Sequence, residues 1–497
     1  MNGVCKDIDR LLMLTRLRVS GFKNLVDIDV RFGPFTCIAG ANGVGKSNLL
    51  DAIVFLSRLA DRTLLDAALS VRDLGEKTGD VRGLFHHSGD HFAENIVLTA
   101  EMIIPETGID DLGQKAKASS TFVEYSVTLR YRKEESARGL GSLELWRENL
   151  RHITLGDAPK HLPFPKSRDW LRRTIKNMRR TANYISTEDA GPDRFIMVHQ
   201  DGGSSGRPQK ILAKNLPRTV LSRANSAESS TATIVRREMQ SWRLLQLEPS
   251  SLREPDDFLA PTELGSDGSH LPATLFHLAN AEGVDPAAVY AEVANGLSRL
   301  IDDVRSVNVD RDERRQLLTL TASGKDGTAH PARSLSDGTL RFLALEVLSI
   351  DPAAQGLLCL EEPENGIHPE RLPAMIQLLK ELATDPTEDW DGPLRQVIIN
   401  THSPAVAMQV PEDSLLLAEP VTMTQGGRSF QALRLLSLSG TWRETSNNGP
   451  SIAKGSLLAY LNPVARQEKL KEDRLTRRVV DREDLLQYKF SFTGSGQ

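Results

Sequence analysis

The segment Gly40–Ser47 constrains this chain most. It reads Gly-Ala-Asn-Gly-Val-Gly-Lys-Ser and fits the phosphate-binding pattern G-x-x-x-x-G-K-[ST] at every fixed position. Residues 36–40 before it are expected to form a short buried strand, and residues 48–59 after it have the apolar spacing of a helix. A strand, a glycine loop and a helix in this order predict a site where backbone N–H groups and a helix N-terminus surround a polyphosphate.

Two side chains of this segment have predicted roles. Lys46 is expected to reach the β- and γ-phosphates of a nucleoside triphosphate, and the Ser47 hydroxyl is expected to hold Mg²⁺. The residues predicted to contact the nucleotide are Gly40, Asn42, Gly43, Gly45, Lys46, Ser47 and Asn48. The alternative is a glycine turn beside a solvated lysine.

Composition places the chain among globular proteins. It has 497 residues, of which 39% are hydrophobic and 26% charged, enough for two to four domains. No apolar run approaches the roughly 20 residues of a membrane span, and the first residues lack the layout of a signal peptide, so we expect a cytoplasmic protein without a membrane partner. Cys5, Cys37 and Cys359 are expected to be unpaired thiols. The net charge of −5 means that any DNA contact must come from a local basic patch.

A second acidic motif follows much later in the sequence. Residues 356–360 are apolar and are followed by Glu361 and Glu362, which predicts a buried strand that ends in adjacent carboxylates. Glu361 is expected to hold Mg²⁺, and Glu362 to polarise the water that attacks the γ-phosphate. The alternative is a strand followed by an acidic turn.

Two further segments flank this motif. Ser336-Asp-Gly338 is predicted to be a turn at the start of a helix, where the serine could also act as an ordinary helix cap. Residues 396–401 are predicted to form another buried strand, and His402 lies just past its end. Taken alone, such a histidine is more often structural than functional.

Together these segments resemble the ATP-binding-cassette (ABC) type ATPases. The order is a P-loop, a short Ser-x-Gly signature, a strand with two glutamates, and a strand followed by Thr-His-Ser. The opening around Phe22 and Asn24 and the run Glu361–Pro369 narrow the resemblance to the RecF, SMC-head and OLD (overcoming lysogenization defect) branch. It covers residues 14–60 and 330–410.

The resemblance implies roles for these residues. ATP and Mg²⁺ would be the ligands, and Lys46, Glu362 and His402 the catalytic set, with His402 as the switch histidine. Ser336 and Gly338 would contact the γ-phosphate held by a second protomer. The loop at Asn365 and Gly366 would lie at the dimer interface.

The sequence departs from the family pattern at three places. Glu361 stands where aspartate is commoner, and Asp337 and Thr339 differ from transporter signatures. No convincing Q-loop glutamine is found, because Gln114 is the only glutamine between Ser47 and residue 190. The turn Arg82–Gly89 is a weak substitute.

The expected fold is an α/β ABC-type ATPase head, with a mixed central sheet, flanking helices, an antiparallel β subdomain and a helical insertion or lid. We expect residues 1–150 to form the first ATPase lobe and residues 151–305 a mainly helical insertion. Residues 306–440 would form the second lobe, and 441–497 a charged tail. Residues 403–497 lack the acidic pattern of a metal-dependent nuclease.

One basic segment within the expected insertion is a candidate DNA-binding surface. Five of its residues fall near one helical stripe: Arg168, Arg172, Lys176, Arg179 and Arg180. With Arg173 added, the segment around Trp170 is strongly basic. Such a stripe fits a DNA backbone or an acidic partner. A solvated helix face is the alternative.

The function expected from these observations is a Mg²⁺-dependent ATPase. Its ATP-bound homodimer, or higher even oligomer, would act as a switch on a separate effector, a nuclease or toxin, in anti-phage defence. The alternatives are a DNA repair factor like RecF, and a scaffold assembled by ATP in which hydrolysis is incidental.

Overall fold

The structure is a computed structural model. It describes residues 13–71, 80–89, 91–133, 141–177, 182–191, 193–201, 208–301, 304–388, 395–425, 427–446, 450–453 and 457. Cys5, Arg179, Arg180 and most of the charged tail 441–497 lie outside these ranges, so the expectations for them stay predictions. Among the described residues, no helix has the length and apolar character needed to cross a bilayer.

A seven-stranded sheet among the described residues carries the glycine loop near its middle, in the order β14-β19-β20-β3-β21-β22-β23. Its strands are β14 (Arg243–Leu245), β19 (Gly356–Glu361), β20 (Arg395–Thr401), β3 (Phe35–Ala39), β21 (Leu415–Gln425), β22 (Arg428–Leu438) and β23 (Ser451–Ile452). The strands from β14 to β21 run parallel, and β22 is antiparallel to β21. Every residue of β3 and β20 is buried, as expected for parallel strands covered on both faces.

An eight-stranded antiparallel sheet, again within the described residues, has the order β13-β12-β11-β10-β9-β6-β1-β2. Its strands are β1 (Met13–Ser20), β2 (Ile28–Arg31), β6 (Asn95–Ile103), β9 (Phe122–Arg132), β10 (Ser142–His152), β11 (Ile185–Ala190), β12 (Asp193–Val198) and β13 (Gln209–Leu212). Buried and part-exposed residues alternate along β10, because only one face of this sheet packs on the core.

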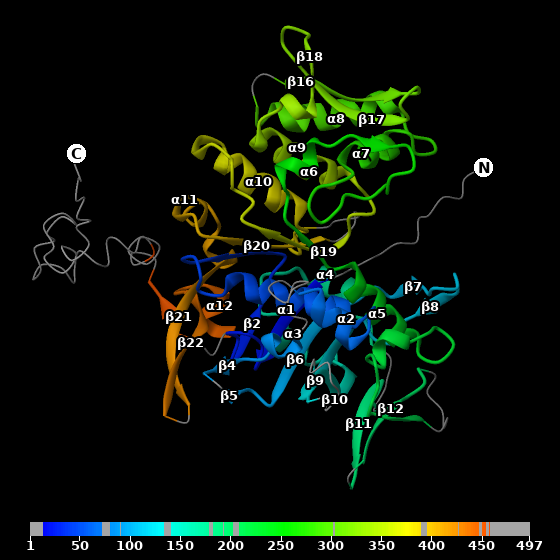
Figure 1. Cartoon of the computed structure of the whole chain (residues 1–497), viewed down its shortest axis with the longest axis vertical. Helices are drawn as coiled ribbons and strands as arrows, with labels where there is room; N and C mark the ends of the chain where they lie inside the picture. Colours follow the sequence, from blue (N-terminus) through cyan, green and yellow to red (C-terminus); the bar gives the residue numbers. More distant parts are fainter. Residues whose placement is uncertain are drawn as a thin grey trace, which may run out of the picture.

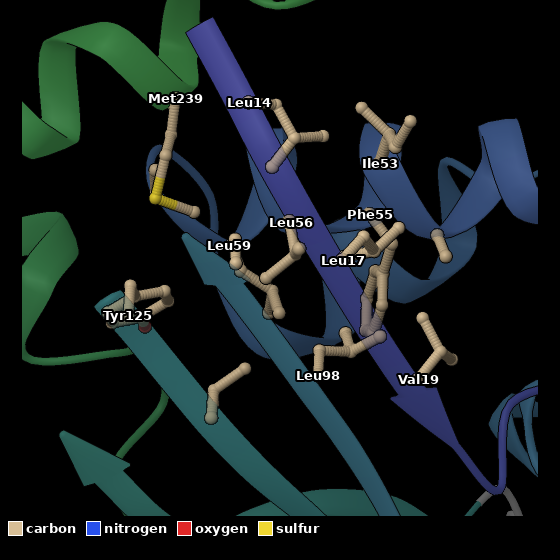
Figure 2. Close-up of a cluster of buried hydrophobic side chains, with 14 of the residues drawn as sticks. Leu14, Leu17, Val19, Ile53, Phe55, Leu56, Leu59, Leu98, Tyr125 and Met239 are labelled. Atoms are coloured by element: carbon tan, nitrogen blue, oxygen red, sulfur yellow. The ribbon is translucent and has the colours of Figure 1, made fainter. Parts of the chain in front are cut away.

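Helix α1 (Lys46–Leu59) lies between the two sheets. Its apolar face packs with strand residues on both sides, and the labelled members of this core include Leu14, Leu17, Phe55, Leu56 and Tyr125 (Figure 2). Helix α5 (Ser230–Ser241) packs beside α1. Helix α2 (Leu64–Leu69) comes after α1 in the chain and also contacts it. This packing sets the direction of α1, and its N-terminus is the end that adjoins the glycine loop.

The opposite face of the seven-stranded sheet is covered by a second core (Figure 1). Its helices are α6 (Pro249–Arg253), α7 (Leu271–Ala279), α8 (Pro286–Ser298), α9 (Asp337–Ile350) and α10 (Leu372–Leu382). A small sheet joins them, formed by β15 (Asp256–Asp257), β16 (Val304–Asp312), β17 (Leu317–Gly324) and β18 (Ala329–Pro331). Along β19, Leu357 and Cys359 face the first core whereas Leu358 and Leu360 face the second. The helices α1 and α9 therefore cover opposite faces of one sheet.

The remaining elements are short and lie outside the two large sheets and the helices that cover them. They are β4 (His87–Ser88), β5 (His91–Phe92), β7 (Thr107–Ile109), β8 (Lys115–Lys117), α3 (Ala158–His161), α4 (Arg168–Thr174), α11 (Pro404–Ala407) and α12 (Trp442–Ser446). Single 3-10 turns occupy Val81–Leu84, Leu221–Arg223, Ala332–Ser334, Pro369–Arg371 and Glu412–Ser414.

The fold class expected from the sequence is confirmed, but residues 151–305 differ from the single helical insertion that we expected. This segment supplies β11, β12 and β13 to the antiparallel sheet and β14 to the seven-stranded sheet. Only its last part, from α6 to α8, joins the second core. The error has a physical cause: β11 and β13 are short and largely solvent-facing, so they lack the apolar alternation that marks a half-buried strand.

Candidate nucleotide site

The glycine loop connects the buried strand β3 to α1. Gly43 and Gly45 have positive φ angles of 77° and 105°, which L-residues with a side chain rarely adopt. A Cβ at Gly45 would also overlap the side-chain amide of Asn24. Among the described residues, no side chain caps the N-terminus of α1. Its first N–H groups and its positive dipole end are therefore arranged to meet an anion in the loop.

Lys46 is folded over this loop. Its Nζ donates hydrogen bonds to the carbonyl oxygens of Gly40 and Ala41, each at 2.8 Å, and the side chain is 5% exposed. Burial lowers the pKa of its ammonium from the ordinary value, and the nearby carboxylates oppose this shift. A phosphate oxygen bound at the loop would find the charge already desolvated and in position.

The turn that follows β1, at Lys23 and Asn24, contacts both the glycine loop and the start of α1. The Nδ2 of Asn24 donates to the Val44 carbonyl at 2.9 Å, and its Oδ1 accepts from Nδ2 of Asn48 at 2.8 Å. Lys23 forms an ion pair with Asp51 of α1 at 3.0 Å, and both side chains are buried. The opening segment and the start of α1 thus hold the glycine loop between them.

Glu361 ends β19 directly beside the loop. Its Oε1 accepts a hydrogen bond from the Ser47 hydroxyl and lies 3.3 Å from Nδ2 of Asn400. Its Oε2 accepts from Nε2 of Gln246, at the end of β14. A hydroxyl and a carboxylate in contact are the oxygen ligands that Mg²⁺ takes from proteins, which usually add phosphate oxygens and water. Ser47 and Glu361 therefore fit an ion shared with a nucleotide. The described residues contain no group of three or more His, Cys, Asp or Glu side chains arranged to hold a metal.

Glu362 is paired with His402. The distance from Glu362 Oε1 to His402 Nδ1 is 2.8 Å, and Oε2 accepts from Nδ2 of Asn365 at 3.0 Å. Glu362 has a φ angle of 44°, and its N–H points to the main-chain and side-chain oxygens of Asn400 at 3.1 and 3.0 Å. Such backbone strain in a non-glycine residue costs about 1–3 kcal/mol and is often found at functional sites.

The signature residues lie elsewhere. Ser336 caps α9, with its Oγ accepting from the Thr339 N–H at 3.2 Å, and both Ser336 and Asp337 are exposed. A Cβ at Gly338 would lie 3.0 Å from the Gly366 carbonyl oxygen, so the signature packs on the loop after Glu362. Because α9 covers the face of the sheet opposite α1, no described contact joins Ser336 to the glycine loop of its own chain.

Two neighbouring arginines hold the signature in place. Arg253, at the end of α6, donates to Asp337 and, at 3.2 Å, to the Leu335 carbonyl. Arg341 donates from Nη1 to the Asn365 carbonyl at 2.6 Å. The segment from Gln246 to Arg253 therefore touches Glu361 at one end and the signature at the other.

Gln246 is a site residue that the sequence analysis missed. It stands where a Q-loop glutamine is expected, at the end of a strand of the nucleotide sheet and in contact with the acid Glu361. The expectation from the sequence covered only residues up to 190, whereas β11 to β13 precede β14 and place this strand further along the chain. The sequence signal for this residue is the run Arg243-Leu-Leu-Gln246, in which a short strand-like segment is followed directly by a glutamine. The turn Arg82–Gly89 contacts Lys23, Phe92 and Tyr131 instead.

The basic segment does not form the helical stripe expected from the sequence. Helix α4 ends at Thr174. Beyond it, the Thr121 N–H donates to the Lys176 carbonyl at 3.0 Å, and the Lys176 N–H donates to the Thr121 hydroxyl at 2.8 Å. Arg168, Arg172, Arg173 and Lys176 are exposed, and Arg172 lies 4.0 Å from Asp169. These four described basic residues are thus spread over a short helix and the strand-like segment after it.

Comparison with known proteins places this site in a family. Residues 35–98 and 138–408, more than half of the chain, match the family described as "AAA domain, putative AbiEii toxin, Type IV TA system". A RecF DNA replication and repair protein from Porphyromonas gingivalis is 37% identical over 81 residues, which are 16% of this chain and 22% of that protein. An OLD nuclease from Thermus scotoductus is 54% identical over 41 residues, 8% of each chain. The matches thus span less than a quarter of the length of these curated relatives.

Similar solved structures include an Smc head bound to the C-terminal winged-helix domain of ScpA, with a TM-score of 0.44 and 14% identity over 86% of this chain and 98% of that one. An Smc head derived from Pyrococcus furiosus has a TM-score of 0.43 and 12% identity over 86% and 97%. The chain belongs to the AAA-domain family described as putative AbiEii toxin of type IV toxin–antitoxin systems, and its short matches to RecF and OLD proteins agree with the resemblance seen in the sequence.

Proposed function

We propose that this chain hydrolyses ATP with Mg²⁺ and that a second copy closes each site. The observation that carries this proposal is the contact between Ser47 and Glu361, which come from distant parts of the chain. Beside it, Glu362 and His402 form a second polar pair at 2.8 Å. A hydroxyl for the metal, an acid for the metal and an acid for the water thus meet at one sheet edge, as phosphoryl transfer requires.

Each side chain has a distinct part in this reaction. Lys46 and the N-terminus of α1 bind the β- and γ-phosphates. Bound Mg²⁺, held by Ser47 and Glu361, would offset the charge that develops on the phosphate oxygens. Glu362 orients the attacking water and accepts its proton, and His402 holds that carboxylate in place through Nδ1. Ser336 and Gly338 of the second copy add donors to the γ-phosphate, so the closed state depends on ATP.

The proposed output is conformational. ATP joins two copies because its charge is shared between their donors, and hydrolysis removes that bridge. We infer that this switch controls a separate effector, a nuclease or toxin, in a bacterial anti-phage defence complex in the cytoplasm. The description of the family as a putative AbiEii toxin of a toxin–antitoxin system and the OLD nuclease relative support this assignment.

A RecF-like role in DNA repair is the second candidate. The RecF relatives favour it, and the exposed Arg168, Arg172, Arg173 and Lys176 supply a local positive surface. Binding to gapped or end-containing DNA that weakens steeply with salt, and that is lost when these residues become glutamine, would support it. A scaffold with incidental hydrolysis is the third candidate, and it predicts full biological activity in Glu362→Gln.

The test uses purified protein and the native host locus together. Wild type should release phosphate from ATP only with Mg²⁺, whereas Glu362→Gln should bind ATP and lose turnover by at least about 100-fold. Glu370→Gln is the matched control, because its side chain is 88% exposed. In phage plating on cells carrying the whole locus, Lys46→Ala and Glu362→Gln should lose protection. Normal hydrolysis by Glu362→Gln would contradict the assignment of the catalytic acid.

A further inference from the structure

A third carboxylate lies behind the two that the mechanism uses. Glu364 is 7% exposed, and its Oε1 accepts a hydrogen bond from the hydroxyl of Thr401, the last residue of β20. The next residue in the chain is His402, which pairs with Glu362. Two neighbouring residues at the end of one strand are thus bound by two acids from one turn.

The Glu364 carboxyl is poorly supplied with partners. Among the residues that the structure describes, none donates a hydrogen bond to its buried Oε2. Burial raises the pKa of this carboxyl above its ordinary value, and its hydrogen bond with Thr401 opposes the rise. A buried acid with an oxygen left unmatched is costly, so its retention beside Glu362 calls for a compensating role.

Thr401 connects this acid to both halves of the site. Its carbonyl oxygen accepts from the N–H of Gly40, the first residue of the glycine loop, at 3.1 Å. Its hydroxyl also accepts from the Ser403 N–H at 2.9 Å, which fixes the turn that contains His402. Because Thr401 is fully buried, a change in its hydroxyl contact is transmitted to that turn rather than absorbed by solvent.

We propose that Glu364 is a positioning residue: through the Thr401 hydroxyl it holds the turn of His402 so that the imidazole meets Glu362. This inference rests on the proposed ATPase function, and it adds a residue that does not touch the nucleotide. The strained φ angle of Glu362 makes the arrangement dependent on its supports, since a strained residue relaxes when its neighbours are loosened.

Glu364 needs only an acceptor oxygen for this role. Glu364→Gln keeps such an oxygen, whereas Glu364→Leu has similar bulk and no acceptor. On the other side of the contact, Thr401→Ser keeps the hydroxyl and Thr401→Val removes it with little change in shape. The four variants therefore separate the hydrogen bond from packing.

The first measurement is steady-state ATP hydrolysis. Glu364→Leu and Thr401→Val should each lower kcat by about 10-fold or more with KM for ATP within about 3-fold, and the double variant should lose little beyond either single one. Glu364→Gln and Thr401→Ser should keep at least about half of the wild-type kcat. Glu346→Ala, which removes a buried carboxyl of α9, serves as the control. Wild-type kcat in Thr401→Val, or equal losses in the Leu and Gln variants, would overturn the proposal.

The second measurement does not depend on turnover. In protein labelled at the Cε1 carbon of its 11 histidines, the His402 ring signal is assigned with His402→Gln. Glu362→Gln should shift this signal in the wild-type and Glu364→Gln backgrounds, but not in Glu364→Leu or Thr401→Val. A shift of the same size in all four backgrounds would refute the positioning role even if wild type proved unable to hydrolyse ATP, and absence of hydrolysis alone would refute only the proposed function.

Discussion

The glycine-loop corner and the signature corner of this molecule are built very differently. Around the glycine loop, Lys46 is buried, and Ser47 contacts an acid from a distant strand. Around the signature, Ser336 and Asp337 are exposed; Ser336 contacts Thr339 of its own helix, and Asp337 contacts Arg253 of α6. The glycine-loop corner is largely complete within a single chain. At the signature corner, by contrast, the N-terminus of α9 is exposed to solvent.

This difference follows from the layers of the fold. The seven-stranded sheet separates α1 on one face from α9 on the other. The start of α9 therefore lies on the other side of the sheet from the glycine loop of its own chain. This separation supports the proposal that the signature serves a second copy.

The largest effect is expected at the complete corner. Lys46→Ala should weaken ATP binding by about 100-fold or more, because it removes a desolvated positive charge from the phosphate site. Isothermal titration calorimetry with ATP and Mg²⁺ measures the effect. Lys380→Ala on the exposed face of α10 is the matched control and should bind like wild type. Unchanged affinity in Lys46→Ala would mean that the nucleotide binds elsewhere.

The contrast itself is tested by mixing two inactive variants. Ser336→Arg should bind ATP but lack turnover, and Lys46→Ala should lack both. A mixed dimer contains one site in which the intact glycine loop of one chain meets the intact signature of the other. An equal mixture should regain up to about a quarter of wild-type hydrolysis, since about half of the dimers are mixed and each has one intact site. If the signature worked within its own chain, the mixture would stay inactive.

A moderate effect is expected where the two corners are linked. Arg253→Ala removes the contact of α6 with Asp337 and with the Leu335 carbonyl, and should lower turnover by about 3- to 10-fold without weakening ATP binding. Asp337→Asn should have a similar effect, and the double variant should add little. Arg314→Ala, in the exposed turn between β16 and β17, is the control. If the losses of turnover in Arg253→Ala and Asp337→Asn were fully additive, the two residues would act independently, which would contradict a shared role for their contact.

The smallest effect concerns the free energy of unfolding, through a buried glutamate of α9, the helix that begins at the signature. Burial raises the pKa of Glu346 on α9 from 4.5 to about 7. Between these values the folded chain holds the proton that the unfolded chain releases, so the free energy of unfolding contributed by this group falls as pH rises through about 7. Glu346→Gln should remove this dependence and gain about 1–3 kcal/mol relative to wild type between about pH 5 and about pH 8. Urea unfolding at both pH values measures it, and parallel curves for the two proteins would contradict the assignment.

The sequence predicted those parts of the site whose residues are adjacent in the chain. Gly40–Ser47 sets its own backbone conformation, and an apolar strand that ends in Glu361 and Glu362 identifies a sheet edge by itself. The sequence also predicted an antiparallel β subdomain, to which β6 and β9 belong. These signals are local, so a single sequence suffices to detect them.

The rest depended on tertiary structure. Gln246 is recognisable only after β14 is placed next to β19, because glutamine has no preference for strand ends. The end of α4 at Thr174 depends on a backbone pairing with Thr121, which the charge pattern could not reveal. The Thr401–Glu364 contact likewise joins two segments that neither motif connects.

The most direct test of a site shared between two copies is the mass of Glu362→Gln in solution, measured by light scattering after size exclusion. With ATP and Mg²⁺ we predict a particle of twice the chain mass of 54.8 kDa, or a higher even multiple, and with ADP a shift back toward the single chain. A variant that binds ATP with wild-type affinity but keeps the same mass with ATP, with ADP and without nucleotide would contradict the account.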